Sequence, residues 1–307
     1  MIIKRILGGD ASSKGFAVWV DGVWKRLEIG GDDLVGVLSA LKGKGSDEVS
    51  TSNLTPANQN DVIPYRPASY RDFMLYEQHA IDAGRGFIKK YMPKALPVMK
   101  IYELLIGKIF PPIRPSARYY KYPIYYLGNH LNFFSEGDVI QMPSYTQELD
   151  YELEIAAIII RPLKNAQPEE VDAAIGGFVI LNDFSARDQQ MDEMKSGFGP
   201  MKTKNFANAI SATVATADAI LPVLNALTVK VTINNKLVAQ STTGGYKYSI
   251  QEAIAYASWE EQLHPGELFA MGTIPGCAGI ENGNFLNKGD TIKLEVEGIG
   301  SLTNVVG

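Results

Sequence analysis

The sequence predicts a β-rich α+β fold, and three observations favour this class. Apolar and polar residues alternate near both ends of the chain, at residues 16–24 and 290–297. Between them, short runs rich in β-branched residues, such as 155–160, are typical of buried strands. Stretches of helical character are few. We therefore expect many short strands with a small number of helices.

The length of the chain fits one large domain or a small domain joined to a larger one, and it favours the second. The chain has 307 residues, of which 46% are hydrophobic and 21% charged, as in ordinary soluble domains. Residues 42–60 are rich in Gly, Ser, Asn and Thr and predict a loop or linker. We place a boundary near residues 62–66, which predicts a small N-terminal domain, 1–66, and a larger domain, 67–307.

Charge and cysteine content exclude several classes of protein. The net charge of -5 gives no basic footprint for nucleic acid. No run reaches the length of a membrane span, and the N-terminus lacks a long apolar region, so we expect a cytoplasmic protein without a membrane partner. The single cysteine, Cys277, excludes an intramolecular disulfide and a thiolate metal cluster, and we expect it to be a buried small residue.

The first half of the chain predicts mixed local structure. Residues 16–24 predict a hairpin and residues 34–41 a short helix. Residues 68–84 predict a partly helical segment, because no proline lies between Ala68 and Gly84. Gly84 is expected to end this helix. Residues 91–123 hold six prolines and many aromatic residues, which predicts an ordered loop or lid.

From Pro123 onward the pattern changes to short strands. A helix is predicted at 168–175, a loop at 189–204, and a second helix at 249–262 with Ser249 as a possible N-cap. Asn234-Asn235 predicts a turn. The predicted strands are 124–126, 149–160, 177–181, 227–233, 237–240 and 290–297.

Two carboxylates interrupt the apolar run at 149–160. Glu152 and Glu154 are two residues apart, so in a strand their side chains point to the same face. Like charges beside a core are costly unless a shared cation compensates them. The alternative is that this face is exposed to solvent and both residues are ordinary surface glutamates.

The three histidines differ in their sequence context. His79 precedes Asp82 by three residues, so on a helix the carboxylate can orient the imidazole for general-base chemistry. A helix-surface ion pair explains the same spacing. His264 precedes Pro265-Gly266 and is typical of a surface turn, whereas His130 lies in a loop and can line a site.

Asp183 follows an apolar strand, at a position where ligand-binding groups are common, although Asn-Asp pairs also open turns. Oxygen ligands from Glu152, Glu154 and Asp183 suit Mg²⁺, Mn²⁺ or Ca²⁺ and not zinc. The tight turn at 272–276 offers a hydroxyl and backbone N–H groups that either bind an oxyanion or only turn a corner.

Together, these segments resemble the fumarylacetoacetate hydrolase family from about Arg71 to the C-terminus. Residues 149–154 resemble the family's Glu-x-Glu metal strand, and 182–190 resemble its Asn-Asp-x-Ser-Ala-Arg-Asp signature. Residues 199–206 match the segment that carries a site lysine, at Lys204, and 272–274 match a late Gly-Thr turn. The order of the segments makes the joint match specific.

The resemblance implies a mixed β-roll or sandwich core and a set of site residues. His79 falls on the water-activating histidine, with Asp82 in place of the glutamate that many members carry. Lys204 falls on a catalytic donor. Met74 stands where the fumarylacetoacetases have a tyrosine, and Ile88 where they have a substrate-binding arginine. The implied metal ligands are Asp72, Glu152, Glu154 and Asp183, and the implied substrate-side residues are Tyr126, Gln190, Thr273 and Met74.

The resemblance also implies a reaction. We expect a Mg²⁺-dependent enzyme, with Mn²⁺ or Ca²⁺ as alternatives, that hydrolyses a carbon–carbon bond in a β-diketo acid or acylpyruvate-like substrate. Decarboxylation, dehydration or tautomerisation of 2-oxo acids on the same fold is the first alternative. A non-catalytic protein that binds an oxo acid through its metal is the second. The family resemblance further implies a homodimer.

Overall fold

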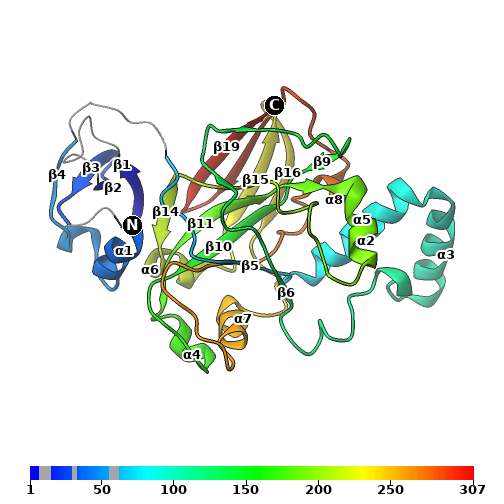
Figure 1. Cartoon of the computed structure of the whole chain (residues 1–307), viewed down its shortest axis with the longest axis horizontal. Helices are drawn as coiled ribbons and strands as arrows, with labels where there is room; N and C mark the ends of the chain where they lie inside the picture. The colour runs from blue at the N-terminus through cyan, green and yellow to red at the C-terminus, as the bar shows by residue number, and fades with distance from the viewer. Residues whose placement is uncertain (7–14, 30–32, 55–61) are drawn as a thin grey trace.

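The computed structural model describes residues 1–6, 15–29, 33–54 and 62–307. These residues form a β-rich α+β fold, as the sequence predicts (Figure 1). The strands are β1 (Ile2–Ile6), β2 (Gly15–Val20), β3 (Val23–Leu27), β4 (Thr51–Asn53), β5 (Tyr70–Phe73), β6 (Tyr125–Leu127), β7 (Phe133–Phe134), β8 (Val139–Ile140), β9 (Leu149–Asp150), β10 (Leu153–Ile159), β11 (Ile175–Asp183), β12 (Ser185–Ala186), β13 (Asn208–Ile210), β14 (Thr213–Thr216), β15 (Thr228–Ile233), β16 (Lys236–Thr242), β17 (Leu268–Ala270), β18 (Thr291–Val296) and β19 (Gly300–Val306).

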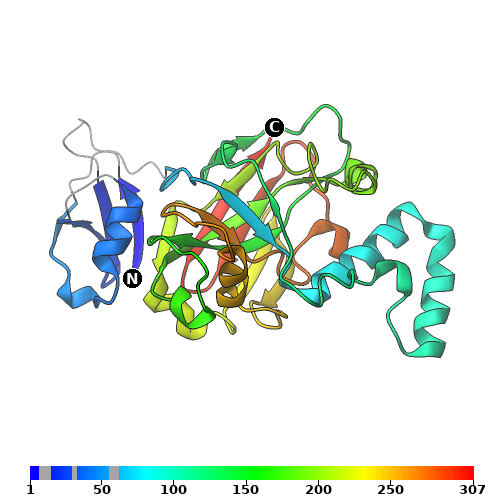
Figure 2. The ribbon, with the colours of Figure 1, turned by 60° about the horizontal axis from the view of Figure 1, so that its bottom comes forward.

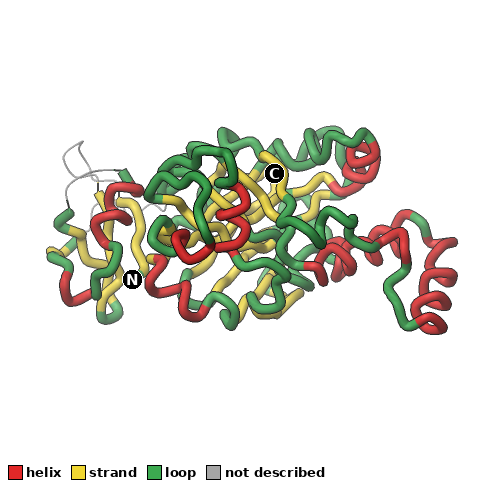
Figure 3. The backbone as a smooth tube through the Cα atoms, turned by 90° about the horizontal axis from the view of Figure 1, so that it is seen from below, coloured by secondary structure: helices red, strands yellow, loops and turns green. Residues whose placement is uncertain are grey.

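Most helices lie at the periphery of the strands (Figure 3). No helix among the described residues is long and apolar enough to cross a membrane. The α-helices are α1 (Leu34–Leu41), α2 (Glu77–Tyr91), α3 (Leu96–Ile106), α4 (Pro168–Val171), α5 (Arg187–Lys195), α6 (Ala217–Ile220), α7 (Ile250–Ala257) and α8 (Gly279–Asn282).

Most of the described strands belong to two sheets. The larger sheet has the order β4-β3-β2-β1-β14-β11-β10-β17-β5-β6, and β13 and β7 extend it beside β11. The smaller sheet has the order β16-β15-β18-β19-β8, and a short β12-β9 pair stands apart. Strand β17 pairs antiparallel with β10 and parallel with β5, so it joins the middle of the larger sheet to the segment that precedes α2.

Strand β10 is buried on both of its faces. Ile155, Ala157 and Ile159 pack in one core cluster with strands of the smaller sheet. Ala156 and Ile158 pack in a second cluster with residues of β1, β2 and α1. This explains why the strand is an almost unbroken apolar run and does not alternate with polar residues.

The N-terminal strands continue the larger sheet at its edge. The predicted hairpin forms from β2 and β3, and the predicted helix forms as α1, where the Asp33 side chain accepts hydrogen bonds from the first-turn amides. Strand β1 pairs antiparallel with β14, so this unit is hydrogen-bonded to the rest of the protein. The domain boundary near residue 66 stays a prediction, and part of the predicted linker, residues 55–61, lies outside the described residues.

Several local predictions are wrong in part. The helix predicted at 249–262 forms as α7, which ends at Ala257. Residues 70–73 form strand β5, because they pair with β17, and α2 begins at Glu77 and continues through Gly84. The proline-rich segment contains helix α3, because Pro97 lies in its first turn, where proline is tolerated (Figure 2). The predicted loop at 189–204 is helical up to Lys195, and the helix at 168–175 ends at Val171.

The C-terminal predictions are confirmed in their main features. Asn234 and Asn235 form the turn between β15 and β16 with left-handed backbone angles. Ser249 caps α7 through a hydrogen bond from Glu252 N. Strand β18 alternates between buried and half-buried residues, as its pattern predicts. The predicted strand at 149–160 is interrupted, because Tyr151 and Glu152 lie between β9 and β10.

Candidate active site

Three buried carboxylates meet at one face of the larger sheet. Asp72 is on β5, Glu154 on β10, and Asp183 at the end of β11. One oxygen from each carboxylate lies within 4.8 Å of those from the other two. Strand β17 lies between β10 and β5, and its Ala270 pairs with Ala156 of β10 and with Asp72 of β5.

The hydrogen bonds of these carboxylates leave one oxygen atom, Asp183 Oδ1, without a partner. Tyr70 donates to Asp72 Oδ2 at 2.7 Å, and Tyr126 donates to Asp183 Oδ2 at 2.8 Å. Glu154 accepts from the Gly272 amide at 3.1 Å. Asp183 Oδ1 is buried and has no hydrogen-bond partner. A buried acceptor without a partner indicates a place where a ligand binds.

The local charges do not balance. Lys204 contacts the carboxylates of Glu152 and Asp183, whereas Asp72 and Glu154 contact no cationic side chain in the described part of the chain. Burial, together with the neighbouring acids Asp72 and Asp183, raises the pKa of Glu154 well above its ordinary value. Burial likewise raises the pKa of Asp183, although Lys204 acts against it. Holding these acids ionised together requires a further positive charge.

The residues present fit a hard divalent cation. All three groups offer carboxylate oxygens, which is the donor set of Mg²⁺, Mn²⁺ and Ca²⁺. Asp72, Glu154 and Asp183 would hold the ion, and their geometry brings together three of the four predicted ligands.

Glu152, the fourth predicted ligand, has a different environment. Its carboxylate contacts Lys204, accepts from Arg187 Nη2 at 2.7 Å and lies 3.8 Å from His79 Nε2. Burial acts to raise the pKa of Glu152, but Lys204 and Arg187 hold it below its ordinary value. In this structure Glu152 therefore pairs with Lys204 and Arg187. Its role as a metal ligand stays a prediction.

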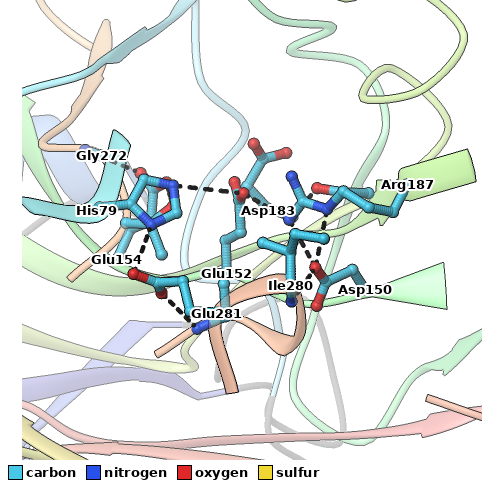
Figure 4. Close-up of polar contacts among 12 residues, drawn as sticks. His79, Asp150, Glu152, Glu154, Asp183, Arg187, Gly272, Ile280 and Glu281 are labelled. Atoms are coloured by element: carbon cyan, nitrogen blue, oxygen red, sulfur yellow. Dashed lines mark hydrogen bonds and ion pairs between the residues drawn. The ribbon is translucent and has the colours of Figure 1, made fainter. Parts of the chain in front are cut away.

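His79 faces Glu281 and not Asp82. His79 Nδ1 lies 3.2 Å from Glu281 Oε1, and both side chains are buried (Figure 4). Burial acts to lower the pKa of His79, but the Glu281 carboxylate raises it above its ordinary value. Because Glu281 faces Nδ1, the other ring nitrogen, Nε2, is left on the side of Glu152 and available to exchange a proton.

The predicted pair between His79 and Asp82 does not form. Asp82 accepts hydrogen bonds from Gln78 and from Arg85, at 2.7 Å and 2.9 Å. Arg85 is one turn farther along α2 and half-exposed, so it draws the Asp82 carboxylate toward solvent. Sequence reasoning missed Glu281, because its closeness to His79 depends on packing between distant segments and has no local signal.

Two of the four predicted substrate-side residues contact carboxylates of the cluster. Tyr126 contacts Asp183, and Thr273 donates to Glu154 Oε1 at 3.3 Å. Gln190 accepts from Arg187 Nη1 at 2.8 Å. Met74 is exposed, and its backbone lies against the Gly272 turn. Their roles toward a substrate stay predictions.

Cys277 is the buried residue that the sequence predicts. It is a free cysteine, and burial raises the pKa of its thiol to about 12. A thiol of this kind is not ionised at neutral pH, so it is a poor nucleophile.

The fold and the carboxylate cluster define a β-rich protein with a candidate divalent-cation centre. The profile of the family "Fumarylacetoacetate (FAA) hydrolase C-terminal" matches residues 112–307, which is more than half of the sequence. The chain therefore belongs to the fumarylacetoacetate hydrolase family. This family is enzymatic, and the assignment confirms the resemblance seen in the sequence.

Curated relatives and solved structures agree with this assignment. A fumarylacetoacetate hydrolase domain-containing protein 2 homolog of Dictyostelium discoideum is 33% identical over 180 residues, which is 55% of this chain and 58% of that protein. The mitochondrial oxaloacetate tautomerase fahd2 of Xenopus laevis is 30% identical over 187 residues, covering 61% of this chain and 58% of that protein. The matches thus span less than two thirds of these relatives.

Similarity to solved structures extends over the whole fold. A fumarylacetoacetate hydrolase from Exiguobacterium antarcticum has a TM-score of 0.69 at 21% identity and covers 99% of both chains. A 5-carboxymethyl-2-hydroxymuconate delta-isomerase from Mycobacterium smegmatis has a TM-score of 0.66 at 20% identity and covers 100% of this chain and 99% of its own. At these identities the likeness concerns the fold alone.

Proposed function

We propose that this protein is a divalent-cation-dependent tautomerase or isomerase of 2-oxo acids of the oxaloacetate type. The observation that carries the proposal is the His79–Glu281 pair: His79 Nε2 lies 3.8 Å from Glu152, and Lys204 contacts both Glu152 and Asp183 of the acidic cluster. The names of curated relatives, among them oxaloacetate tautomerases of Xenopus laevis and Rattus norvegicus, support this reaction over the predicted carbon–carbon hydrolysis.

The chemistry requires only a proton to move. In keto–enol conversion, the bond between hydrogen and the carbon next to the carbonyl breaks, and an O–H bond forms. His79 Nε2 accepts the proton from carbon and returns it to the carbonyl oxygen, and Glu281 stabilises the imidazolium between the two transfers. Ketonisation runs the same transfers in reverse. Lys204, a buried cation, offsets negative charge that develops on the substrate oxygen. A divalent cation, when bound, would polarise the carbonyl group as a Lewis acid.

The test follows the two tautomers directly. Fresh enol oxaloacetate is mixed with purified protein, and its ultraviolet absorbance is recorded with Mg²⁺ or Mn²⁺, after chelation, and after the metal is added back. We expect faster ketonisation that disappears on chelation and in His79→Ala, while the control His264→Ala keeps wild-type rates. Activity that ignores the chelator or the loss of His79 contradicts the proposal.

Hydrolysis of an acylpyruvate-like substrate is the second candidate. It is favoured by the same His79–Glu281 pair, which also suits deprotonation of a water molecule. Product analysis separates the reactions, because hydrolysis gives two acids, decarboxylation releases carbon dioxide, and tautomerisation preserves the carbon skeleton. Homodimer formation, a cytoplasmic location and Mg²⁺ as the native ion remain parts of the proposal.

A further inference from the structure

The His79–Glu281 pair is assembled from two helices that are distant in sequence. His79 is in the first turn of α2, and Glu281 is in α8, which has only four residues. A helix of this length has little stability of its own. Contacts outside α8 must therefore determine where the Glu281 carboxylate lies.

Asp150 holds α8 from one side. Its Oδ1 accepts the Gly279 amide at 2.6 Å, and its Oδ2 accepts the Ile280 amide at 2.9 Å (Figure 4). Arg187 Nε donates to the same Oδ2 at 2.8 Å, which fixes the carboxylate. A Cβ added at Gly279 would lie 2.4 Å from Asp150 Oδ1, so only glycine lets α8 approach this closely.

Gly86 brings α2 against α8 from the other side. A Cβ added at Gly86 would lie 2.0 Å from the carbonyl oxygen of Ile280 and 2.9 Å from its carbonyl carbon. Both are backbone atoms, so no side-chain rotation relieves the overlap. Gly86 follows His79 by two turns on the same face of α2, so this close approach also determines how His79 meets Glu281.

We propose that Gly86 and Asp150 are positioning residues for the His79–Glu281 pair. Gly86 sets the approach of α2 to α8, Asp150 sets the place of α8, and together they align Nδ1 of His79 with the Glu281 carboxylate. The inference rests on the proposed function in so far as His79 is the base. A misplacement of about 1 Å in such a group costs roughly 10²-fold in rate.

The experiment compares two identical substitutions in one helix. Gly86→Ala adds a methyl group against the backbone of α8. Gly84→Ala adds the same group two residues earlier, where it meets the side chain of Ile113, at 2.8 Å from its Cβ. We expect Gly86→Ala to lower kcat about 10- to 100-fold with little change in KM. Gly84→Ala should keep kcat near the wild-type value.

Two further measurements show whether Gly86 acts through Glu281. In the Glu281→Gln background, Gly86→Ala should cause no additional loss of kcat, because the alignment it disturbs is already absent. Additive losses overturn the proposal. The ¹⁵N NMR signal of His79 Nδ1, assigned with His79→Gln, should shift in Gly86→Ala and not in Gly84→Ala.

The NMR signal also separates this inference from the proposed function. If the wild-type protein shows no tautomerase activity but the His79 signal shifts as described, the function fails and the positioning holds. An unchanged His79 signal in folded Gly86→Ala overturns the positioning. If Gly86→Ala does not fold, Asp150→Asn, which disturbs α8 from the opposite side, is measured in the same way, and an unchanged His79 signal again overturns it.

Discussion

Asp82 is close to His79 in the sequence, whereas Glu281 is close to it in the structure. Their carboxylates contact different groups. Glu281 accepts the amides of Gly276 and Ala278, each at 3.1 Å, and is thereby held against His79 Nδ1. Asp82 is bound to Gln78 and Arg85 near the surface. Of these two acids, only Glu281 is placed to stabilise a protonated imidazole.

Neutralising each acid in turn tests this difference. Glu281→Gln should lower kcat by about 10- to 100-fold, because it removes the charge that orients and stabilises the His79 imidazolium. Asp82→Asn is the matched control and should leave kcat close to that of the wild type. Steady-state kinetics on both variants decide the point, and a larger loss in Asp82→Asn would restore the pair predicted from the sequence.

Helix α5 holds the segment that carries Lys204. The Glu193 carboxylate accepts hydrogen bonds from the amides of Met201, Lys202 and Thr203, at 2.8 Å, 2.9 Å and 3.1 Å. Burial acts to raise the pKa of Glu193, but these donors and the Thr203 hydroxyl together hold it below its ordinary value. We call this set of hydrogen bonds between Glu193 and residues 201–203 the Glu193 clasp. In the folded state it favours the ionised carboxylate.

This clasp should weaken in acid. Because the folded pKa is lowered, its stabilisation is complete above the ordinary pKa of glutamate and is lost as the pH falls through the lowered pKa. We expect the amides of residues 201–203 to lose protection against hydrogen exchange in that range, after correction for intrinsic rates. Glu193→Gln should abolish this pH dependence, and an identical profile in both proteins would contradict the clasp.

Some helices and strands can be predicted from local sequence pattern, and others cannot. The hairpin of β2 and β3, helix α1 and the alternating strand β18 follow from short-range patterns. Strand β5 and helices α3 and α5 do not. Residues 70–73 become a strand by pairing with β17, nearly two hundred residues later, and no window of the sequence contains that partner.

For the whole molecule, the acidic cluster joins strands β5, β10 and β11, so its charge affects global stability. A divalent cation that binds only the folded state should increase the free energy of unfolding by about 2.7 kcal/mol at a hundredfold excess over Kd. The melting temperature should rise accordingly. Asp183→Asn should abolish most of this rise. Asp172→Asn, at an exposed carboxylate outside the cluster, is the control and should retain it. Thermal unfolding with and without Mg²⁺ or Mn²⁺ measures both.

A cation-independent melting temperature in the wild type would contradict the metal site while leaving the fold assignment intact. The assignment rests on the family match over residues 112–307 and does not depend on the ion.

The β-rich class and the family could be predicted from the sequence, because strand periodicity and motif spacing are local properties of the chain. The resemblance also implied four ligands, of which Asp72, Glu154 and Asp183 converge. Only the tertiary structure shows which of these side chains meet. It separated Glu152, paired with Lys204 and Arg187, from the three convergent carboxylates, and it gave His79 the partner Glu281 in place of Asp82. The physical reason is that the approach of α2 to α8 depends on backbone contacts at Gly86 and Gly279, between segments that only folding brings together.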